Sequence, residues 1–206
     1  MPRSGETPAM SLSPAHAADV EEAALAALGG GDYRTVLDVL MRAYGASVYR
    51  YCRAMLGDAE RAKDALQKTF VQVYEGLPRF ERRCPLRNWV FTIARHRCLD
   101  EAKVWRRWTR RTTSLYEMPA ERGALPAAAD TAERRLLDDE CRRVLARCLG
   151  ELAPHIRDAV IQRYVEGLSY TEMADVSGDR PATLQARVTR ALPALRRCVE
   201  KCGMTA

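Results

Sequence analysis

The sequence has no long hydrophobic run, few histidines and none of the short motifs that mark common enzyme classes. No stretch approaches the roughly 20 apolar residues that a membrane-spanning helix needs, and the N-terminus lacks the layout of a signal peptide. Its three histidines, His16, His96 and His155, lie far apart without plausible catalytic partners. No glycine-rich phosphate loop, nucleophile elbow or zinc-protease motif is present. We therefore expect a cytoplasmic protein without membrane insertion and without enzymatic activity.

The seven cysteines are odd in number and irregularly spaced, which argues against the disulfide framework of a small secreted protein. Cys198 and Cys202 are four residues apart and could offer two metal ligands from one face of a helix. Cys141 and Cys148 could complete such a site only if the tertiary structure brought them close. Whether these four residues sense metal or redox state stays open. The simpler expectation is ordinary buried thiols, no cofactor and no bound metal.

Alternating strand patterns are also missing, whereas apolar residues at three- and four-residue spacing are frequent, so we predict an all-α protein. One such series predicts a long amphipathic helix over residues 37–55, which Gly57 ends. Asp58 then caps a second helix over residues 59–77. A third long helix begins near Leu86 and continues past Trp105.

Changes in composition divide the chain into four segments. Residues 1–19 are small, polar and proline-containing, which predicts a disordered tail. Residues 20–108 form a first helical domain and residues 131–206 a second. Residues 109–130, rich in Thr, Pro and Ala, are interpreted as a flexible linker. Because this linker lacks an apolar stripe, we expect the two domains to behave as tethered modules.

Residues 167–195 carry the pattern of a helix-turn-helix. Ser169 and Glu172 form the capping-box pattern S-x-x-E, a tight turn with Gly178 follows, and Pro181 suits the first position of a second helix. In such motifs the second helix enters the major groove of DNA. The residues expected to face solvent are Ala182, Thr183, Gln185, Ala186, Arg187, Thr189 and Arg190. The alternative is an ordinary solvated helical hairpin.

A second basic segment lies at the end of the first domain, in a chain whose net charge is +6 and whose pI is near 9.1. This charge suits a polyanionic partner such as nucleic acid. Tryptophans accompany the cations, a combination suited to single-stranded nucleic acid, because bases stack on aromatic rings. The basic residues are Arg95, Arg97, Lys103, Arg106, Arg107, Arg110 and Arg111. The alternative, which we favour for Trp105, is that Trp89 and Trp105 are core residues.

Two long stretches together resemble a known family. The segments YGASVYRYCRAMLGDAERAKDALQKTFVQVYEGLPRF and PLRNWVFTIARHRCLDEAKVWRR are similar to region 2 of the extracytoplasmic-function (ECF) sigma factors of the sigma-70 family. The segment LAPHIRDAVIQRYVEGLSYTEMADVSGDRPATLQARVTRALPALR is similar to their region 4. The resemblance implies a subunit that directs core RNA polymerase to specific promoters and assists promoter melting. It also implies two helical domains and three partners: core polymerase, promoter DNA and an anti-sigma factor.

The resemblance assigns a role to each basic segment and to one helix of the first domain. The residues implied to bind the clamp helices of the largest polymerase subunit are Asp64, Gln67, Lys68 and Phe70. Those implied to bind the −10 element are Arg87, Asn88, Trp89, Arg95, His96, Lys103, Arg106 and Arg107. Those implied to bind the −35 element are Arg180, Ala182, Thr183, Gln185, Arg187, Thr189 and Arg190.

The chain departs from the family pattern at several of these positions. Lys68 stands where the family usually carries Glu, and His96 where Asn is common. Asp179, Ala182 and Gln185 replace other residues of the helix-turn-helix, which suggests an unusual promoter preference. Late in the second helix, a proline at position 193 should kink or end it. Two alternatives stay open: a stand-alone helix-turn-helix regulator, and a sigma-like decoy that binds an anti-sigma protein and no DNA.

Overall fold

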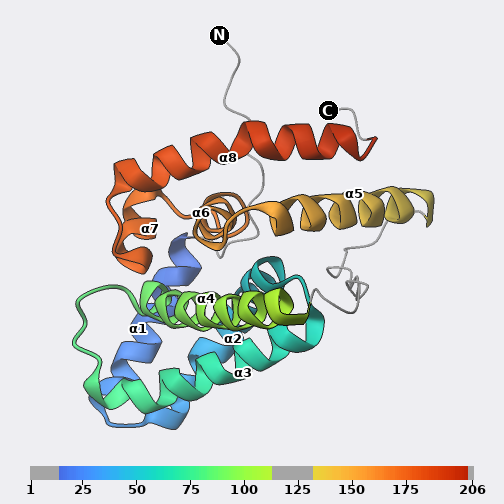
Figure 1. Ribbon diagram of the computed structural model, residues 1–206. Coiled ribbons are helices and arrows are strands. Elements are labelled where there is room, and N and C mark those ends of the chain that lie inside the picture. The colour runs from blue at the N-terminus through green and yellow to red at the C-terminus, as the bar shows by residue number, and fades with distance from the viewer. Residues whose placement is uncertain (1–13, 113–131, 204–206) are drawn as a thin grey trace.

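The computed structural model describes the backbone of residues 14–112 and 132–203, and the side chains of residues 16–105 and 140–203. Within these ranges the chain forms eight α-helices and one short 3-10 helix and contains no strand, which confirms the predicted all-α class (Figure 1). The elements are α1 (Pro14–Gly29), α2 (Tyr33–Leu56), α3 (Ala59–Gly76), η1 (Leu77–Arg79), α4 (Leu86–Thr112), α5 (Ala132–Glu151), α6 (Pro154–Tyr164), α7 (Tyr170–Ser177) and α8 (Pro181–Lys201).

Local chemistry fixes where the helices of the first half begin and end. Asp32 and Asp58 cap α2 and α3, because their carboxylates accept the backbone N–H groups of Thr35 and Arg61. Gly57 closes α2 in a left-handed conformation with φ of 73°. The carboxylate of Glu21 in α1 accepts the N–H of Leu86 at 2.9 Å, which satisfies the start of α4.

The core of the first half lies between α2, α3 and α4, with α1 packed against α2 (Figure 1). The apolar stripe predicted for α2 faces this core, apart from Met41, which is exposed. Its buried members include Leu40, Tyr44, Val48, Tyr51, Cys52 and Met55. These residues meet Phe70 and Val73 from α3 and Val90, Phe91 and Ala94 from α4.

The second half is built around α8, which packs on α5, α6 and α7. The predicted helix-turn-helix is confirmed as α7, a turn and α8. Ser169 and Glu172 form the full capping box at the start of α7, and Gly178 closes that helix in a left-handed conformation with φ of 74°. Leu184, Val188, Ala191 and Leu195 form the buried stripe of α8, as their spacing predicts.

Three boundaries differ from the sequence-based expectation. Helix α1 begins at Pro14, so residues 14–19 of the expected tail are helical, and α4 extends to Thr112, into the expected linker. Residues 1–13 and 113–131 lie outside the described residues. The proline at position 193 does not end α8, which continues to Lys201. Pro193 and Thr189 are both exposed, so water can satisfy the carbonyl that loses its helical N–H partner.

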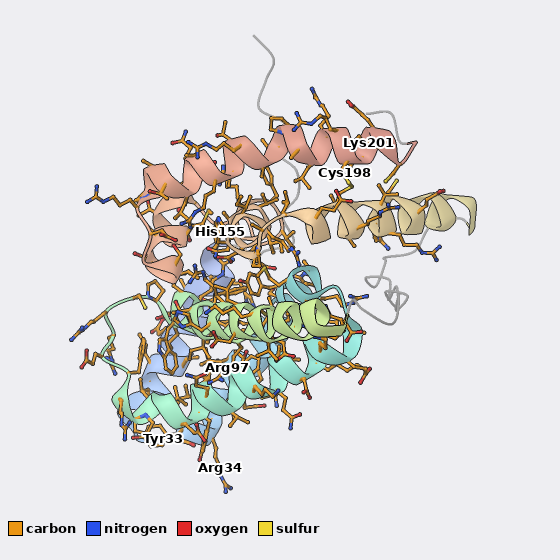
Figure 2. All side chains as sticks on the ribbon, viewed as in Figure 1. Tyr33, Arg34, Arg97, His155, Cys198 and Lys201 are labelled. Atoms are coloured by element: carbon orange, nitrogen blue, oxygen red, sulfur yellow. A yellow bond between two sulfur atoms is a disulfide. The ribbon has the colours of Figure 1, made fainter. Side chains whose placement is uncertain are left out.

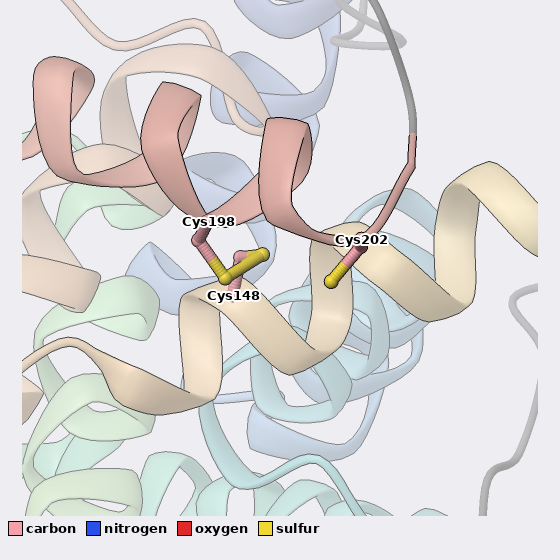
Figure 3. Close-up of side chains that lie close together, drawn as sticks. All are labelled: Cys148, Cys198 and Cys202. Atoms are coloured by element: carbon pink, nitrogen blue, oxygen red, sulfur yellow. A yellow bond between two sulfur atoms is a disulfide. The ribbon is translucent and has the colours of Figure 1, made fainter.

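The cysteines differ from the expected set of ordinary buried thiols. Cys148 of α5 and Cys198 of α8 form a disulfide with a Cα–Cα distance of 5.7 Å (Figure 3). Cys141, expected from the sequence to be a buried thiol, is exposed instead. Cys52 and Cys98 are buried free thiols of the first half. Pairing therefore links residues that are distant in sequence, which spacing alone does not reveal.

The two halves pack against each other rather than standing apart as tethered modules. Helix α6 contacts α2 and α4, and α7 contacts α4, so the second half sits on the α2–α4 face of the first (Figure 1). Side chains of both halves lie between them (Figure 2). Across the junction, Arg157 of α6 donates to the Met55 carbonyl at 2.6 Å.

Within the described ranges, no helix is long and apolar enough to cross a bilayer.

Candidate nucleic-acid interface

The outer face of α8 presents polar side chains in the arrangement expected of a recognition helix. Thr183, Gln185, Thr189 and Arg190 are exposed, as are Ala182 and the preceding Arg180. Such side chains can pair with base edges or phosphates, because Gln matches adenine and Arg matches guanine or phosphate. The structure therefore brings six of the seven residues predicted for the −35 element to one exposed surface.

Arg187 is the exception, because its guanidinium forms an ion pair with Asp179 in the turn of the helix-turn-helix. Its guanidinium donates to both carboxylate oxygens of Asp179, at 2.6 and 3.2 Å. This hydrogen bond, together with the nearby charges, lowers the pKa of Asp179, which therefore stays ionised. Arg187 is thus only partly available to a phosphate in this conformation. Asp179, a departure from the family pattern, thus has a partner within the helix-turn-helix.

The basic helix α4 divides the predicted −10 residues into an exposed group and a buried group. His96 and Lys103 are exposed, and Lys103 pairs with Asp100 at 3.1 Å. Trp105 is 42% exposed and lies under the Arg61 guanidinium at 4.5 Å, so the expectation that it belongs to the core is wrong. The backbone at Arg106 and Arg107 is helical, but their side chains lie outside the described residues.

Trp89 is half-buried at the start of α4 and is held by two neighbours. Its ring packs against Phe80 in a tilted arrangement, with centroids 4.9 Å apart and an interplanar angle of 43°. It also lies against Gly76, where an added Cβ would come within 2.9 Å of the indole ring. A glycine is therefore needed at the end of α3 so that the indole can approach its backbone.

The buried group of α4 points toward the second half of the chain. Arg87 donates to the Glu166 carbonyl at 3.0 Å, and Asn88 donates to Asp175 at 3.3 Å. Arg95 is 8% exposed. Three of the residues predicted to bind the −10 element are therefore engaged by residues of the other half.

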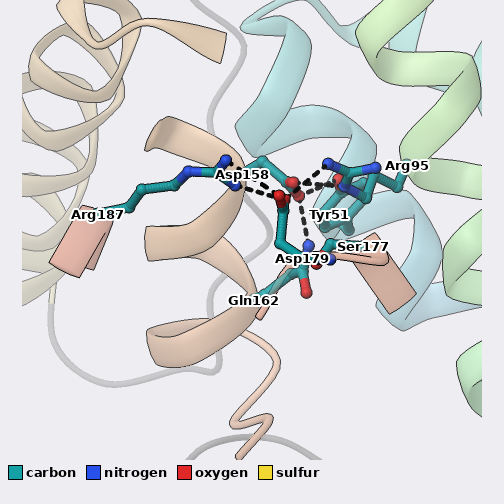
Figure 4. A network of polar contacts seen from close by, with 7 residues as sticks. All are labelled: Tyr51, Arg95, Asp158, Gln162, Ser177, Asp179 and Arg187. Atoms are coloured by element: carbon teal, nitrogen blue, oxygen red, sulfur yellow. Dashed lines mark hydrogen bonds and ion pairs between the residues drawn. The ribbon is translucent and has the colours of Figure 1, made fainter. Parts of the chain in front are cut away.

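Asp158 of α6 is the centre of this junction (Figure 4). It is 1% exposed and accepts hydrogen bonds from Tyr51 at 2.7 Å, Arg95 at 2.6 Å and Gln162 at 2.6 Å. Burial and the Asp158 charge raise the pKa of Tyr51 well above its ordinary value, so the phenol remains a donor. Asp179 extends the network, since its carboxylate lies 4.0 Å from Arg95.

Asp158 and Tyr51 are not among the predicted site residues. The signal that could have found Asp158 is its position, one turn before Ile161 and Gln162 on the buried face of α6. An acid on a buried stripe requires a partner, because an unpaired buried charge is costly. Tyr51 gives no such signal, since a tyrosine in the core stripe of α2 is ordinary.

The predicted polymerase-binding residues of α3 line a shallow surface groove, with one exception. Asp64, Gln67 and Lys68 are exposed and border it together with Val71, Gln72, Glu75 and Arg97. Phe70 is 5% exposed and packs in the core, so its assignment as a contact residue is corrected: it supports the helix from within. Lys68 pairs with Asp64 at 3.3 Å, one turn earlier on the helix.

Glu166 adds a titrating group to the junction between the halves. It is 1% exposed, and its Oε1 atom has no hydrogen-bond partner. Burial raises its pKa from 4.5 to about 7, against the opposing charges of Arg50 on α2 and Arg87 on α4. Its proton is therefore retained in the folded chain at pH values where an unfolded glutamate has lost it.

We expect the free energy of unfolding to fall as pH rises from 4.5 to about 7, the range between the ordinary and the raised pKa of Glu166. The stabilisation is fully present below pH 4.5 and is lost as pH approaches about 7, which amounts to about 3 kcal/mol at 1.36 kcal/mol per unit. Urea unfolding at pH 5 and pH 7.5 should show this loss, and Glu166→Gln should remove it. A Glu166→Gln variant with the wild-type pH dependence would show that other groups set it.

Comparisons with known proteins agree with the geometry. The family described as Sigma-70 region 2 matches residues 40–111, and Sigma-70, region 4 matches residues 142–195. The chain is 31% identical over 170 residues to the probable RNA polymerase sigma-C factor of Mycobacterium bovis, covering 82% of this chain and 85% of that protein. It is 30% identical over 172 residues to the ECF RNA polymerase sigma factor SigL of Mycobacterium tuberculosis, covering 81% and 92%.

Two solved structures share the fold. One is CnrH in complex with the cytosolic domain of CnrY, with a TM-score of 0.63 and 23% identity over 89% of this chain and 99% of that one. The other is the sigma factor RpoE in complex with the anti-sigma factor NepR from Bartonella quintana, with a TM-score of 0.62 and 18% identity over 82% and 97%.

A helical chain with a polar recognition helix in one half and a basic, tryptophan-bearing helix in the other has the organisation of a promoter-binding protein. This chain belongs to the ECF sigma factors of the sigma-70 family. It therefore acts in transcription initiation and gives RNA polymerase its promoter specificity.

Proposed function

We propose that this sigma factor works in the cytoplasm by binding alone, without catalysis, and that its two halves read separate promoter elements. The observation that carries the proposal is the presence, on one chain, of the polar outer face of α8 and of the exposed His96, Lys103 and Trp105 on α4. Major-groove readout suits the first surface. Capture of an unpaired strand by cations and aromatic rings suits the second.

The groove on α3 is the proposed contact with the clamp helices of core polymerase. Val71 is 52% exposed, an apolar group at the edge of a polar groove that a partner helix could cover. Asp64, Gln67 and Lys68 supply the polar rim. A stand-alone regulator has no need of such a surface, so core binding separates these two hypotheses.

We expect Asp64→Ala to weaken co-purification with core polymerase and to leave the fold intact. Asp64 is exposed, and its pairing with Lys68 is a surface ion pair worth about 0–1 kcal/mol. The matched control is Asp38→Ala, which removes an exposed pair with Arg42 on α2. Pulldown with core polymerase and circular dichroism measure both effects. Equal core affinity for Asp64→Ala and Asp38→Ala would remove α3 from the interface.

Base recognition in the −35 element is proposed to rest on Gln185, and recognition in the −10 element on His96. Both are exposed and belong to different halves. A bidentate Gln–adenine pair discriminates by about 1–3 kcal/mol, so Gln185→Ala should relax the −35 preference by roughly 5- to 150-fold. His96→Ala should relax only the −10 preference. Transcription from promoter libraries randomised in one element at a time tests this, and both substitutions shifting one element would contradict it.

The docked arrangement is proposed to be a resting form that opens before promoter binding. Arg87, Asn88 and Arg95 contact the second half, so they reach −10 DNA only when the halves separate. The structural neighbours CnrH and RpoE were solved with CnrY and with the anti-sigma factor NepR. An anti-sigma partner is proposed for this chain as well, acting on the balance between docked and separated halves.

A further inference from the structure

Three cysteine sulfurs meet between α5 and α8 (Figure 3). The Sγ atoms of Cys148, Cys198 and Cys202 all lie within 4.8 Å of one another. Cys198 and Cys202 are one turn apart at the end of α8, and Cys148 faces them from α5. Sequence spacing leaves the Cys198–Cys202 pair without a third ligand, which the packing of α5 on α8 supplies.

The surroundings of these sulfurs are apolar. Cys148 is 1% exposed, and the other two cysteines are half-buried. The neighbouring cluster consists of Leu149, Val160, Ala191 and Leu195, with Val144, Leu152, Ile156 and Val199 packed against it. Among the side chains that the structure describes, no histidine or carboxylate joins the group. Calcium and magnesium, which require oxygen ligands, do not fit such a site.

We propose that the reduced cysteines form a binding site for one monovalent copper ion. Thiolates select soft ions such as Cu(I) and zinc, but structural zinc almost always takes four protein ligands, whereas three sulfurs converge among the side chains that the structure describes. A metal–sulfur distance of about 2.3 Å places three sulfurs around an ion about 4 Å apart, which the 4.8 Å cluster accommodates. The site goes beyond promoter binding and does not depend on it.

Metal binding and the Cys148–Cys198 disulfide exclude each other. A dithiol reductant must first supply two electrons and two protons, which break the S–S bond and leave two thiols. Cu(I) then displaces one proton from each of the three thiols and forms three metal–sulfur bonds. Cytosolic conditions keep thiols reduced, so the metal-binding form is the one available there. Either state connects α5 to α8, behind the recognition face of the helix-turn-helix.

The test is anaerobic titration of the reduced full-length chain with Cu(I) against the chromogenic chelator bathocuproine disulfonate. We expect one equivalent to bind, with X-ray absorption showing three sulfur ligands. Cys202→Ser should weaken binding by at least about 10–100-fold, because even changes outside the ligand set cost that much. Cys202→Ser leaves the Cys148–Cys198 pair in place, so its fold can be checked in the oxidised state. The matched control is Cys141→Ser, an exposed cysteine of α5 outside the cluster.

Three results would overturn the proposal. The first is Cu(I) binding no tighter than in a variant lacking all three cysteines. The second is equal Cu(I) affinity for Cys202→Ser and the wild type, which would reduce the site to a two-sulfur pair. The third is one equivalent of zinc bound with four ligands in preference to Cu(I), which would assign the cluster to another metal.

Discussion

Replacing Asp158 with alanine should separate the two halves of the chain. The substitution leaves the Arg95 guanidinium buried without its carboxylate partner, and removing one member of a buried ion pair costs about 3–5 kcal/mol. Tyr51 and Gln162 lose their acceptor as well. We expect the ratio of docked to separated chains to fall by at least about 100-fold, since each 1.4 kcal/mol is a factor of ten. Small-angle X-ray scattering should show a larger radius of gyration with unchanged helical content.

Comparing Arg95→Ala with Asp158→Ala separates the role of this ion pair in docking the two halves from the proposed role of Arg95 in −10 binding. Arg95→Ala also breaks the junction, but it removes a proposed −10 contact, so it should open the chain without improving transcription. Asp158→Ala should open it and raise transcription when core polymerase is limiting. Asp38→Ala, which removes an exposed ion pair, should do neither. A wild-type radius of gyration for both junction variants would show that Asp158 does not hold the halves together.

Reducing the Cys148–Cys198 disulfide should lower the free energy of unfolding of the second half by about 4 kcal/mol. The bond joins residues 50 apart in sequence, and the loss of chain entropy on closing such a loop gives this magnitude. The closed loop contains α6, α7 and most of α8, so the effect should fall on the helix-turn-helix. Urea unfolding in metal-free buffer, with and without a phosphine reductant, measures it.

The control for this prediction is Cys148→Ser, whose stability should not respond to the reductant. Cys141→Ser should respond as the wild type does, because Cys141 is outside the disulfide. Identical unfolding midpoints for the wild type in oxidising and reducing buffer would mean that the bond does not form in solution or contributes nothing.

Helix positions and the helix-turn-helix could be predicted from sequence because their causes are local. Asp58, Gly57 and the Ser169–Glu172 capping box act within one turn of the helix ends they fix. The stripe of Leu184 and Val188 follows directly from helical period. These signals need no knowledge of the rest of the fold.

The predictions of burial and pairing failed where a residue's surroundings depend on segments distant in the sequence. Helical period places Phe70 with the apolar stripe of α3, which the structure bears out; its assignment as a polymerase contact came from the family resemblance. Trp105 is a large aromatic residue of the kind common in cores, yet it is 42% exposed, with the Arg61 guanidinium over its ring. Asp158 and Arg95 are 63 residues apart, and their pairing depends on how the two halves dock. The cysteine cluster likewise depends on the packing of α5 against α8.

Reconstituted transcription tests the central claim most directly: core polymerase is supplied with the full-length chain and a promoter library, and run-off transcripts are sequenced. We predict transcripts that start at a discrete promoter class only when the chain is added, that diminish with Asp64→Ala, and whose −35 preference relaxes with Gln185→Ala. A chain that elutes apart from core polymerase in gel filtration and leaves the transcripts unchanged would contradict promoter direction by this protein.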